Sequence, residues 1–85
     1  MLYYTYILFS EKINRYYIGS TQSIEQRIIR HNAGATKSTK PGRPWNLAYS
    51  EKFDSKTEAI KRENYLKRLK SRTFIEIPIQ KRSLE

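Results

Sequence analysis

The chain begins with two apolar runs separated by a short polar segment. Residues 2–9 are rich in Tyr, Ile and Leu and contain no Gly or Pro, and residues 16–19 read Tyr-Tyr-Ile-Gly. Aromatic and β-branched side chains favour strands. The segment 10–15 between them is mostly polar, and so short a connection most simply joins antiparallel strands. The pattern therefore predicts a β-hairpin.

Two capping boxes, in which a Ser is followed three residues later by Glu or Gln, predict where helices begin. Residues 23–26 read Ser-Ile-Glu-Gln and open a helix that we expect to end near Asn32, before Gly34. Residues 55–58 read Ser-Lys-Thr-Glu and open a second helix that we expect to run to about residue 70.

A loop and a third strand lie between the two helices. Residues 33–44 hold two of the three glycines and two of the three prolines and show no periodicity, which indicates a loop. Loops of about twelve residues are uncommon in compact domains unless they serve a function. Residues 45–53 regain strand character, and an amphipathic piece at 73–77 ends at Pro78. The order β-β-α-β-α with a short terminal element predicts an α+β fold, with a small three-stranded antiparallel sheet flanked by helices.

Length and composition limit the organisation of the chain. Its 85 residues form a single domain, with a core of about residues 2–77 and an expected frayed tail at 78–85. A domain of this size buries little more than ~60% of its unfolded surface, so any site is shallow. The lack of cysteine excludes disulfides and thiolate zinc sites and is typical of a reducing cytoplasm, the compartment we expect. The N-terminal run has no basic flank or cleavage site, and no run approaches ~18 apolar residues, so we expect neither a signal peptide nor a membrane partner.

The net charge of the chain indicates the kind of partner that it binds. Seventeen Lys and Arg against eight Asp and Glu give a net charge of +9, which favours a polyanion, nucleic acid first and anionic lipid second. Such charges are also common on the solvated faces of ordinary helices. The basic residues that we expect to contact nucleic acid lie in the loop and along the second helix: Lys37, Lys40, Arg43, Lys61, Arg62, Lys67, Arg68, Lys70 and Arg72.

Glu63 is the most informative single position. It falls inside the apolar stripe of the second helix, which Ala59, Ile60, Leu66 and Leu69 define. Acidic side chains are almost never fully buried unless they are paired or bind a metal. Glu63 therefore requires a cation, and two interpretations remain open: a functional metal ligand, or a carboxylate at the edge of the stripe bonded to a neighbouring Arg or Tyr.

Three further residue types offer chemistry on the first helix and the hairpin. Arg27 and His31 are four residues apart, so they share a helix face and can reach one anionic ligand, although a solvated Arg and a structural His give the same pattern. The helix N-terminus adds backbone donors near residues 19–21. Tyr6 and Tyr17 lie on opposite arms of the hairpin, and one register places both phenols on the same face, near Arg27 and Glu63. We expect the other tyrosines to pack in the core or across strands: Tyr3, Tyr4, Tyr16, Tyr49 and Tyr65.

Taken in order, these residues resemble the GIY-YIG nuclease family. The resemblance covers about residues 2–77 and is nearest to small stand-alone members, which are similar to the N-terminal nuclease domain of the UvrC-type excision repair subunit. The family is named after two sequence motifs, Gly-Ile-Tyr and Tyr-Ile-Gly. In this chain the first motif is divergent and the second is intact. The matching residues are Tyr4-Thr5-Tyr6, Tyr17-Ile18-Gly19, Arg27, His31-Asn32, Pro44-Trp45 and Glu63.

The sequence departs from the family pattern at three places. Tyr4-Thr5 replaces Gly-Ile, Ser20 occupies a position that is basic in some members, and residues 73–75 read Thr-Phe-Ile where many catalytic members carry an Asn. Ser20 is nevertheless included among the expected nucleic-acid contacts because of its place in the motif.

The resemblance implies a phosphodiesterase that acts on DNA with one divalent ion, Mg²⁺ or Mn²⁺. By the resemblance, Glu63 is the sole protein ligand of that ion and Arg27 holds the scissile phosphate. Tyr17 acts as general base for the attacking water, Tyr6 positions the water or the phosphate, and His31 is an auxiliary phosphate or proton contact. A free phenol titrates near ~10, so a tyrosine base needs cationic neighbours that lower its pKa. Mg²⁺ retains much of its water, which suits a site with one carboxylate.

The sequence supports an endonuclease or nickase ahead of two other classes. The alternative is a non-catalytic basic module that binds nucleic acid on the same scaffold, and a third possibility is an adaptor for an acidic protein. Branched, flapped and single-stranded DNA all remain open as substrates, and so do repair, recombination, restriction and degradation as roles. With no appended domain in these residues, target choice is expected to come from DNA structure or from a partner protein.

Overall fold

The structure is a computed structural model that describes residues 2–69. The expected amphipathic piece at 73–77, the tail beyond it, Lys70, Arg72 and the position of the missing Asn lie outside these residues. The elements follow the predicted order: β1 (Tyr3–Ser10), β2 (Arg15–Thr21), α1 (Ile24–Asn32), the short 3₁₀ helix η1 (Lys40–Gly42), β3 (Asn46–Phe53) and α2 (Lys56–Arg68).

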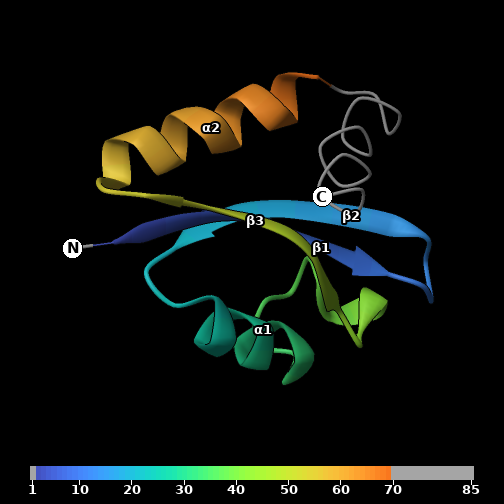
Figure 1. Cartoon of the computed structure of the whole chain (residues 1–85). Coiled ribbons are helices and arrows are strands. Elements are labelled where there is room, and N and C mark those ends of the chain that lie inside the picture. Colours follow the sequence, from blue (N-terminus) through green and yellow to red (C-terminus); the bar gives the residue numbers. More distant parts are fainter. Residues whose placement is uncertain (1, 70–85) are drawn as a thin grey trace.

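The strands form a three-stranded antiparallel sheet in the order β2-β1-β3. In the hairpin, Tyr6 pairs with Gly19 and Leu8 with Tyr17. On its other side β1 pairs with β3, with a register shift between Ile7 and Leu8. Figure 1 shows α1 on one face of the sheet and α2 on the other. The predicted α+β class and the predicted hairpin are therefore confirmed.

The central strand β1 contributes side chains to two separate cores, because successive residues of a strand point to opposite faces. Tyr6 and Leu8 pack with Trp45 on the α1 face, and Ile24 and Ile28 of α1 pack against that core. Ile7 packs with Ile18 of β2 and Leu66 of α2 on the other face. Two helices thus cover a strand that is buried on both sides.

Both predicted serine N-caps form. The Ser23 hydroxyl accepts from the backbone N–H of Gln26, and the Ser55 hydroxyl accepts from the backbone N–H of Glu58, each at 3.3 Å. The first helix ends at Asn32 as expected. The segment predicted as a loop contains η1, which the sequence analysis did not expect because Pro and Gly inside it indicate a turn.

None of the helices within residues 2–69 is long and apolar enough to span a bilayer.

Candidate active site

Tyr6 and Tyr17 lie on the same face of the hairpin, the face that α1 covers. This follows from the register, because Tyr17 pairs with Leu8, two residues along β1 from Tyr6, so the two phenols are diagonal neighbours. Their ring centroids are 6.4 Å apart. The Tyr17 ring also meets the His31 ring edge-on at 4.8 Å. The structure thus brings together three of the five residues to which the family resemblance gives a catalytic role.

Gly19 makes room for the Tyr6 phenol. A Cβ atom at residue 19 would lie 2.5 Å from Tyr6 Oη and 2.7 Å from its Cζ, closer than any ordinary contact. Tyr6 and Gly19 are direct partners across the hairpin, so the ring crosses the space that a side chain at residue 19 would take. The glycine of the Tyr-Ile-Gly sequence is therefore a steric requirement of the tyrosine on the neighbouring strand.

Tyr6 is protonated at physiological pH. Its side chain is 2% exposed. Burial raises the pKa of Tyr6 to about 12, with further raising by Tyr17 and Glu63 and an opposing effect of Arg27. A phenol with this pKa cannot serve as a base near neutral pH, whereas it can donate its proton in a hydrogen bond. Since Arg27 and Glu63 both influence this pKa, their charges act at the buried phenol although they stand on different helices.

His31 is buried between Tyr6 and the loop, with 1% of its surface exposed. Its Nε2 lies 3.5 Å from Tyr6 Oη and its Nδ1 lies 2.9 Å from Thr39 Oγ1. Burial lowers the pKa of His31, and the charges of Arg27 and Arg30 lower it further. The His31 ring is therefore enclosed, and both of its nitrogens lie near partners within the protein, so the auxiliary phosphate or proton contact expected for His31 stays a prediction. Nothing in the sequence pattern indicated Thr39 as one of those partners.

The motif residues Asn32 and Trp45 hold the loop in place. The Asn32 side chain accepts from the Trp45 backbone N–H at 2.6 Å and donates to the Trp45 carbonyl at 3.2 Å. The Trp45 indole N–H in turn donates to the Thr39 carbonyl at 2.7 Å. These two residues therefore fasten the end of α1 to the start of β3 and fix the loop between them.

Glu63 lies on the opposite face of the sheet, where it contacts β2. The Ser20 hydroxyl donates to Glu63 Oε1 and the Lys67 ammonium donates to Glu63 Oε2, both at 2.6 Å. The Glu63 side chain is 17% exposed, so the prediction that it faces the sheet is confirmed. The residue that pairs with Glu63 is Lys67, one helical turn away, and not the Arg or Tyr considered from the sequence. Ser20, expected among the nucleic-acid contacts, directs its hydroxyl to this carboxylate.

The candidate site is therefore divided at one point of β2. Gly19 faces Tyr6 on the α1 side, and the next residue, Ser20, holds Glu63 on the α2 side. Arg27 is half-buried on α1, where its charge acts on both Tyr6 and His31. Gly19 and Ser20 are adjacent in β2, so this strand links the two halves of the site.

The donor set around Glu63 suits one kind of metal ion. Residues 2–69 contain no group of three or more His, Cys, Asp or Glu side chains able to enclose an ion. An ionised carboxylate offers about four acceptor positions, and Ser20 and Lys67 engage one at each oxygen of Glu63. A single carboxylate fits Mg²⁺ or Mn²⁺ that keeps most of its waters and takes its remaining ligands from a phosphate. It does not fit zinc, which needs three or four protein ligands.

The basic residues expected to contact nucleic acid divide into paired and exposed ones. Arg62 donates to Glu51 at 2.6 Å and lies 5.2 Å from the centre of the Tyr65 ring, so the structure gives it a role in joining α2 to β3. Tyr65 is 46% exposed, which corrects its expected place in the core. The Nε of Arg43 donates to the Lys40 carbonyl within the loop. The exposed members are Lys37, Lys40, Lys61, Arg68 and Lys67, of which Lys67 is also paired with Glu63.

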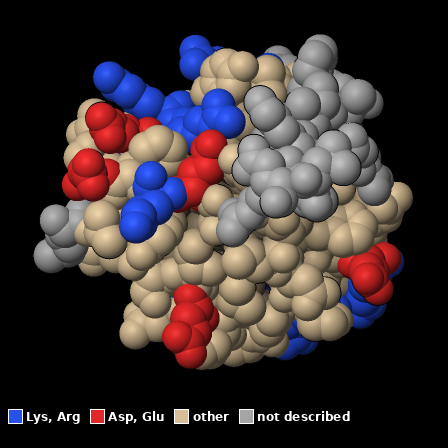
Figure 2. Space-filling model, in the orientation of Figure 1, with Lys and Arg blue, Asp and Glu red and all other residues tan. Residues whose placement is uncertain are grey.

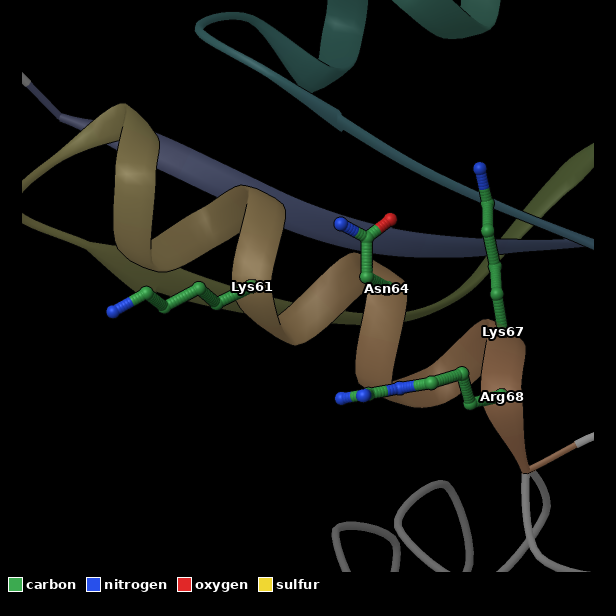
Figure 3. A pocket seen from close by; sticks show the side chains of 4 residues that line it. All are labelled: Lys61, Asn64, Lys67 and Arg68. Carbon is green, nitrogen blue, oxygen red and sulfur yellow. The ribbon is translucent and has the colours of Figure 1, made fainter.

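A basic pocket of about 640 Å³ lies along α2, lined by Lys61, Asn64, Lys67 and Arg68. In Figure 3, Lys61 and Arg68 extend to one side of the helix, and Lys67 extends to the other, towards the strands. Figure 2 shows positive and negative side chains intermingled over the α2 side of the molecule. Lys67 thus lines the pocket while it contacts Glu63, so the pocket adjoins the α2 half of the candidate site.

Comparisons with known proteins identify the family to which the chain belongs. The family model described as the GIY-YIG catalytic domain matches residues 2–75. A UPF0213 protein of Staphylococcus saprophyticus is 52% identical over 52 residues, which cover 60% of this chain and 63% of that relative, slightly less than two thirds of its length. A UPF0213 protein of Staphylococcus haemolyticus is 47% identical over 66 residues, 76% of this chain and 79% of the relative. The solution NMR structure of a UPF0213 protein from Bacillus halodurans is 35% identical and covers 100% of this chain and 86% of its own, with a TM-score of 0.58.

Proposed function

The chain belongs to the GIY-YIG nuclease family, and from this premise we propose that it is a divalent-metal-dependent endonuclease that hydrolyses phosphodiester bonds in DNA. The observation that carries the proposal is the grouping of two tyrosines and a histidine on one face of β1 and β2, with a carboxylate held on the other face at the adjacent residue of β2. A structural core has no need of this combination, because Tyr6 and His31 are almost fully buried and their polar atoms must find partners inside the protein.

In this proposal the two tyrosines have different roles. Tyr6 remains protonated because its pKa is about 12, so the general base is Tyr17, which removes a proton from the attacking water. Arg27 binds the scissile phosphate and supplies positive charge beside both phenols.

Glu63 holds the metal ion, and Ser20 keeps its carboxylate oriented. The ion supplies positive charge that stabilises the leaving oxygen. Lys67, which bonds to Glu63 Oε2, would compete with the ion for the negative charge of Glu63. The Lys67 side chain is 52% exposed, and exposed ion pairs contribute only about 0–1 kcal/mol, so loss of this pair costs little.

Exposed lysines of the loop and of α2 bind the rest of the DNA strand. Lys37 and Lys40 in the loop and the pocket along α2 contact phosphates without reading bases, which gives salt-sensitive, sequence-tolerant binding. Branched, flapped or single-stranded DNA fits such a surface, and a partner protein is the other source of target choice. Repair, recombination and degradation are the roles that this activity serves.

One observation favours a second function, a non-catalytic module that binds nucleic acid. Glu63 is already neutralised by Lys67 of its own helix, as in a purely structural ion pair. Such a module keeps the basic surface and binds DNA without cutting it. The two functions differ in one property, the dependence of DNA cleavage on a divalent ion.

The deciding experiment incubates the purified chain with end-labelled branched, flapped, single-stranded and duplex DNA, with Mg²⁺, with Mn²⁺ and with a chelator. We expect cleavage only with a divalent ion, lost in Tyr17→Phe, Arg27→Ala and Glu63→Ala variants that retain the wild-type circular dichroism spectrum. A folded chain that binds these DNAs with a clear salt dependence and cuts none of them would establish the binding module instead.

A further inference from the structure

Thr39 is a buried hydroxyl that the proposed mechanism does not use. It is 2% exposed, although it lies in a loop whose lysines 37 and 40 are exposed. Its Oγ1 lies 2.9 Å from Nδ1 of His31 and donates to the Thr36 carbonyl at 3.3 Å. A threonine that is buried in a basic surface loop and bonded to a buried histidine requires an explanation.

The bonds of Thr39 determine which nitrogen of His31 carries the proton. A hydroxyl has a single proton, and the Thr36 carbonyl lies 3.3 Å from Thr39 Oγ1, within reach of that proton. When Thr39 donates there, its oxygen accepts from His31 at 2.9 Å, and Nδ1 carries the hydrogen. Burial and the charges of Arg27 and Arg30 lower the pKa of His31, so the ring is neutral at physiological pH and Nε2 carries none. Nε2 is then an acceptor, and it faces the Tyr6 hydroxyl at 3.5 Å.

Thr39 is also held by its backbone, which keeps its side chain beside His31. Its carbonyl accepts from the Trp45 indole N–H at 2.7 Å, and its own N–H donates to the Thr36 carbonyl at 3.2 Å. Trp45 is 4% exposed and is bonded to Asn32. The conformation of the loop thus holds the Thr39 hydroxyl within hydrogen-bond distance of His31 Nδ1.

We propose that Thr39 is a positioning residue that fixes His31 as the Nδ1–H tautomer, so that the Tyr6 proton points to His31 Nε2 and the Tyr6 oxygen is left only as an acceptor. If the proposed nuclease function holds, this tautomer decides whether Tyr6 positions the attacking water or the phosphate. A Tyr6 oxygen that can only accept a hydrogen bond orients a donor, and the attacking water is such a donor. It does not bind a phosphate oxygen, which has no proton to donate.

The tautomer is directly measurable, because the chain has a single histidine. Protein labelled with ¹⁵N only in histidine gives one ring spin system, and long-range ¹H–¹⁵N correlation distinguishes the protonated from the unprotonated nitrogen. We expect Nδ1–H at pH 7.5 in the wild type, without DNA or metal. A neutral ring with the proton on Nε2 overturns the proposal.

Four variants separate Thr39 from other causes. Thr39→Val removes the hydroxyl at nearly constant volume and is expected to shift the tautomer ratio about fivefold towards Nε2–H, the equivalent of one ordinary hydrogen bond. Thr39→Ser restores the wild-type tautomer. Thr36→Val, the matched control, keeps the carbonyl and leaves the tautomer unchanged. Tyr6→Phe also leaves it unchanged, and a change of tautomer in that variant would show that Tyr6 rather than Thr39 sets it. If Thr39→Val does not fold, the wild type, Thr39→Ser and Tyr6→Phe still decide the question.

The activity of the same variants provides the second readout. We expect Thr39→Val to lower kcat by about 10- to 100-fold with KM unchanged, comparable to the loss of an outer partner of a metal-bound histidine, and Thr39→Ser to recover it. A normal kcat in Thr39→Val with an altered tautomer overturns the role of Thr39 in positioning Tyr6. If the wild type cuts no DNA, the nuclease proposal fails, while the tautomer measurement independently decides whether Thr39 orients His31.

Discussion

On the α1 face of the sheet the polar groups of the candidate site are enclosed and bonded in a series, whereas on the α2 face Glu63 and Lys67 lie at the rim of the core. Tyr6, His31 and Thr39 are each no more than 2% exposed. Glu63 is 17% exposed, and its partner Lys67 is 52% exposed. One face therefore holds its polar atoms in a single arrangement, and the other keeps a carboxylate whose partner can exchange.

This difference matches the two tasks of the proposed reaction. The orientation of a water or a phenol benefits from rigid, desolvated hydrogen bonds, because they need no reorganisation during the reaction. An ion that arrives from solvent needs an accessible carboxylate. The strand β2 joins the two environments, since Gly19 and Ser20 are adjacent and face opposite sides.

The largest expected effect comes from removing one reactive group on each face. We predict that Tyr17→Phe on the α1 face and Glu63→Gln on the α2 face each lower the rate of DNA cleavage by at least about 100-fold, because the first removes the base and the second the metal ligand. Steady-state cleavage measures this. Glu58→Gln, an exposed glutamate on the same helix, is the matched control and should retain the wild-type rate. If only one of the first two variants loses activity, the site does not require both faces.

A second test compares two neighbouring residues of β2 that face opposite sides. Gly19→Ala forces a methyl group against the Tyr6 phenol and should lower the free energy of unfolding by about 1–3 kcal/mol. Ser20→Ala removes only the hydrogen bond to Glu63 and should cost about 1 kcal/mol. Urea denaturation of both variants gives the two values. Equal losses would show that the α1 face is no more tightly packed than the rim of the α2 face.

The dependence of the free energy of unfolding on pH below about 6.5 should come in part from His31 on the α1 face. The folded pKa of His31 is lowered, so the unfolded chain binds more protons once the pH falls below about 6.5. Above that pH the buried neutral His31 makes its full contribution to the free energy of unfolding. As the pH falls towards the folded pKa of His31, this contribution decreases by up to about 1.4 kcal/mol per pH unit. Urea unfolding at a series of pH values from 7.5 to about 5 measures the slope. We expect His31→Gln to remove the part of the slope that begins near 6.5, and a slope identical to that of the wild type would contradict the burial of a neutral ring.

The smallest expected effect concerns the exchangeable pair on the α2 face. Lys67→Met should lower the free energy of unfolding by only about 0.3–0.5 kcal/mol, the usual value for a Glu–Lys pair four residues apart on a helix. The same variant should bind Mn²⁺ about twofold more tightly in calorimetry, because the ion no longer displaces the lysine. Lys61→Met, on the same helix without the bond to Glu63, serves as control. Weaker Mn²⁺ binding in Lys67→Met would indicate that Lys67 supports the ion rather than competing with it.

Features that depend on local periodicity were predictable from the sequence. The alternation of a strand and the length of the hairpin placed Tyr6 and Tyr17 on one face, and the helical stripe directed Glu63 to the sheet. The capping boxes predicted the start of both helices. Lys67 as the partner of Glu63 also had a signal, the spacing of four residues, although the sequence analysis sought an Arg or a Tyr.

Features that depend on long-range packing were not predictable. Thr39 lies in an aperiodic loop, and its bond to His31 exists only because Asn32 and Trp45 bring the loop back against α1. The placement of Glu63 on the face opposite the tyrosines depends on which side of the sheet each helix covers. Neither fact is contained in the spacing of residues along one element.

The central position of β1 also affects the order in which the chain can fold. Its hairpin with β2 closes over a few residues, whereas its other edge pairs Tyr3 with Phe53, fifty positions later. Closing so long a loop is the slower step, because its entropy must be lost before the pairing is gained. Until β3 arrives, β1 presents an unpaired edge with the apolar sequence Tyr-Ile-Leu-Phe, the kind of edge that adds strands from other molecules. A nascent chain in which β3 has not yet been synthesised is therefore the form most prone to aggregation. The loop that carries Thr39 lies in the segment that must fold back before β3 can cover the exposed edge of β1.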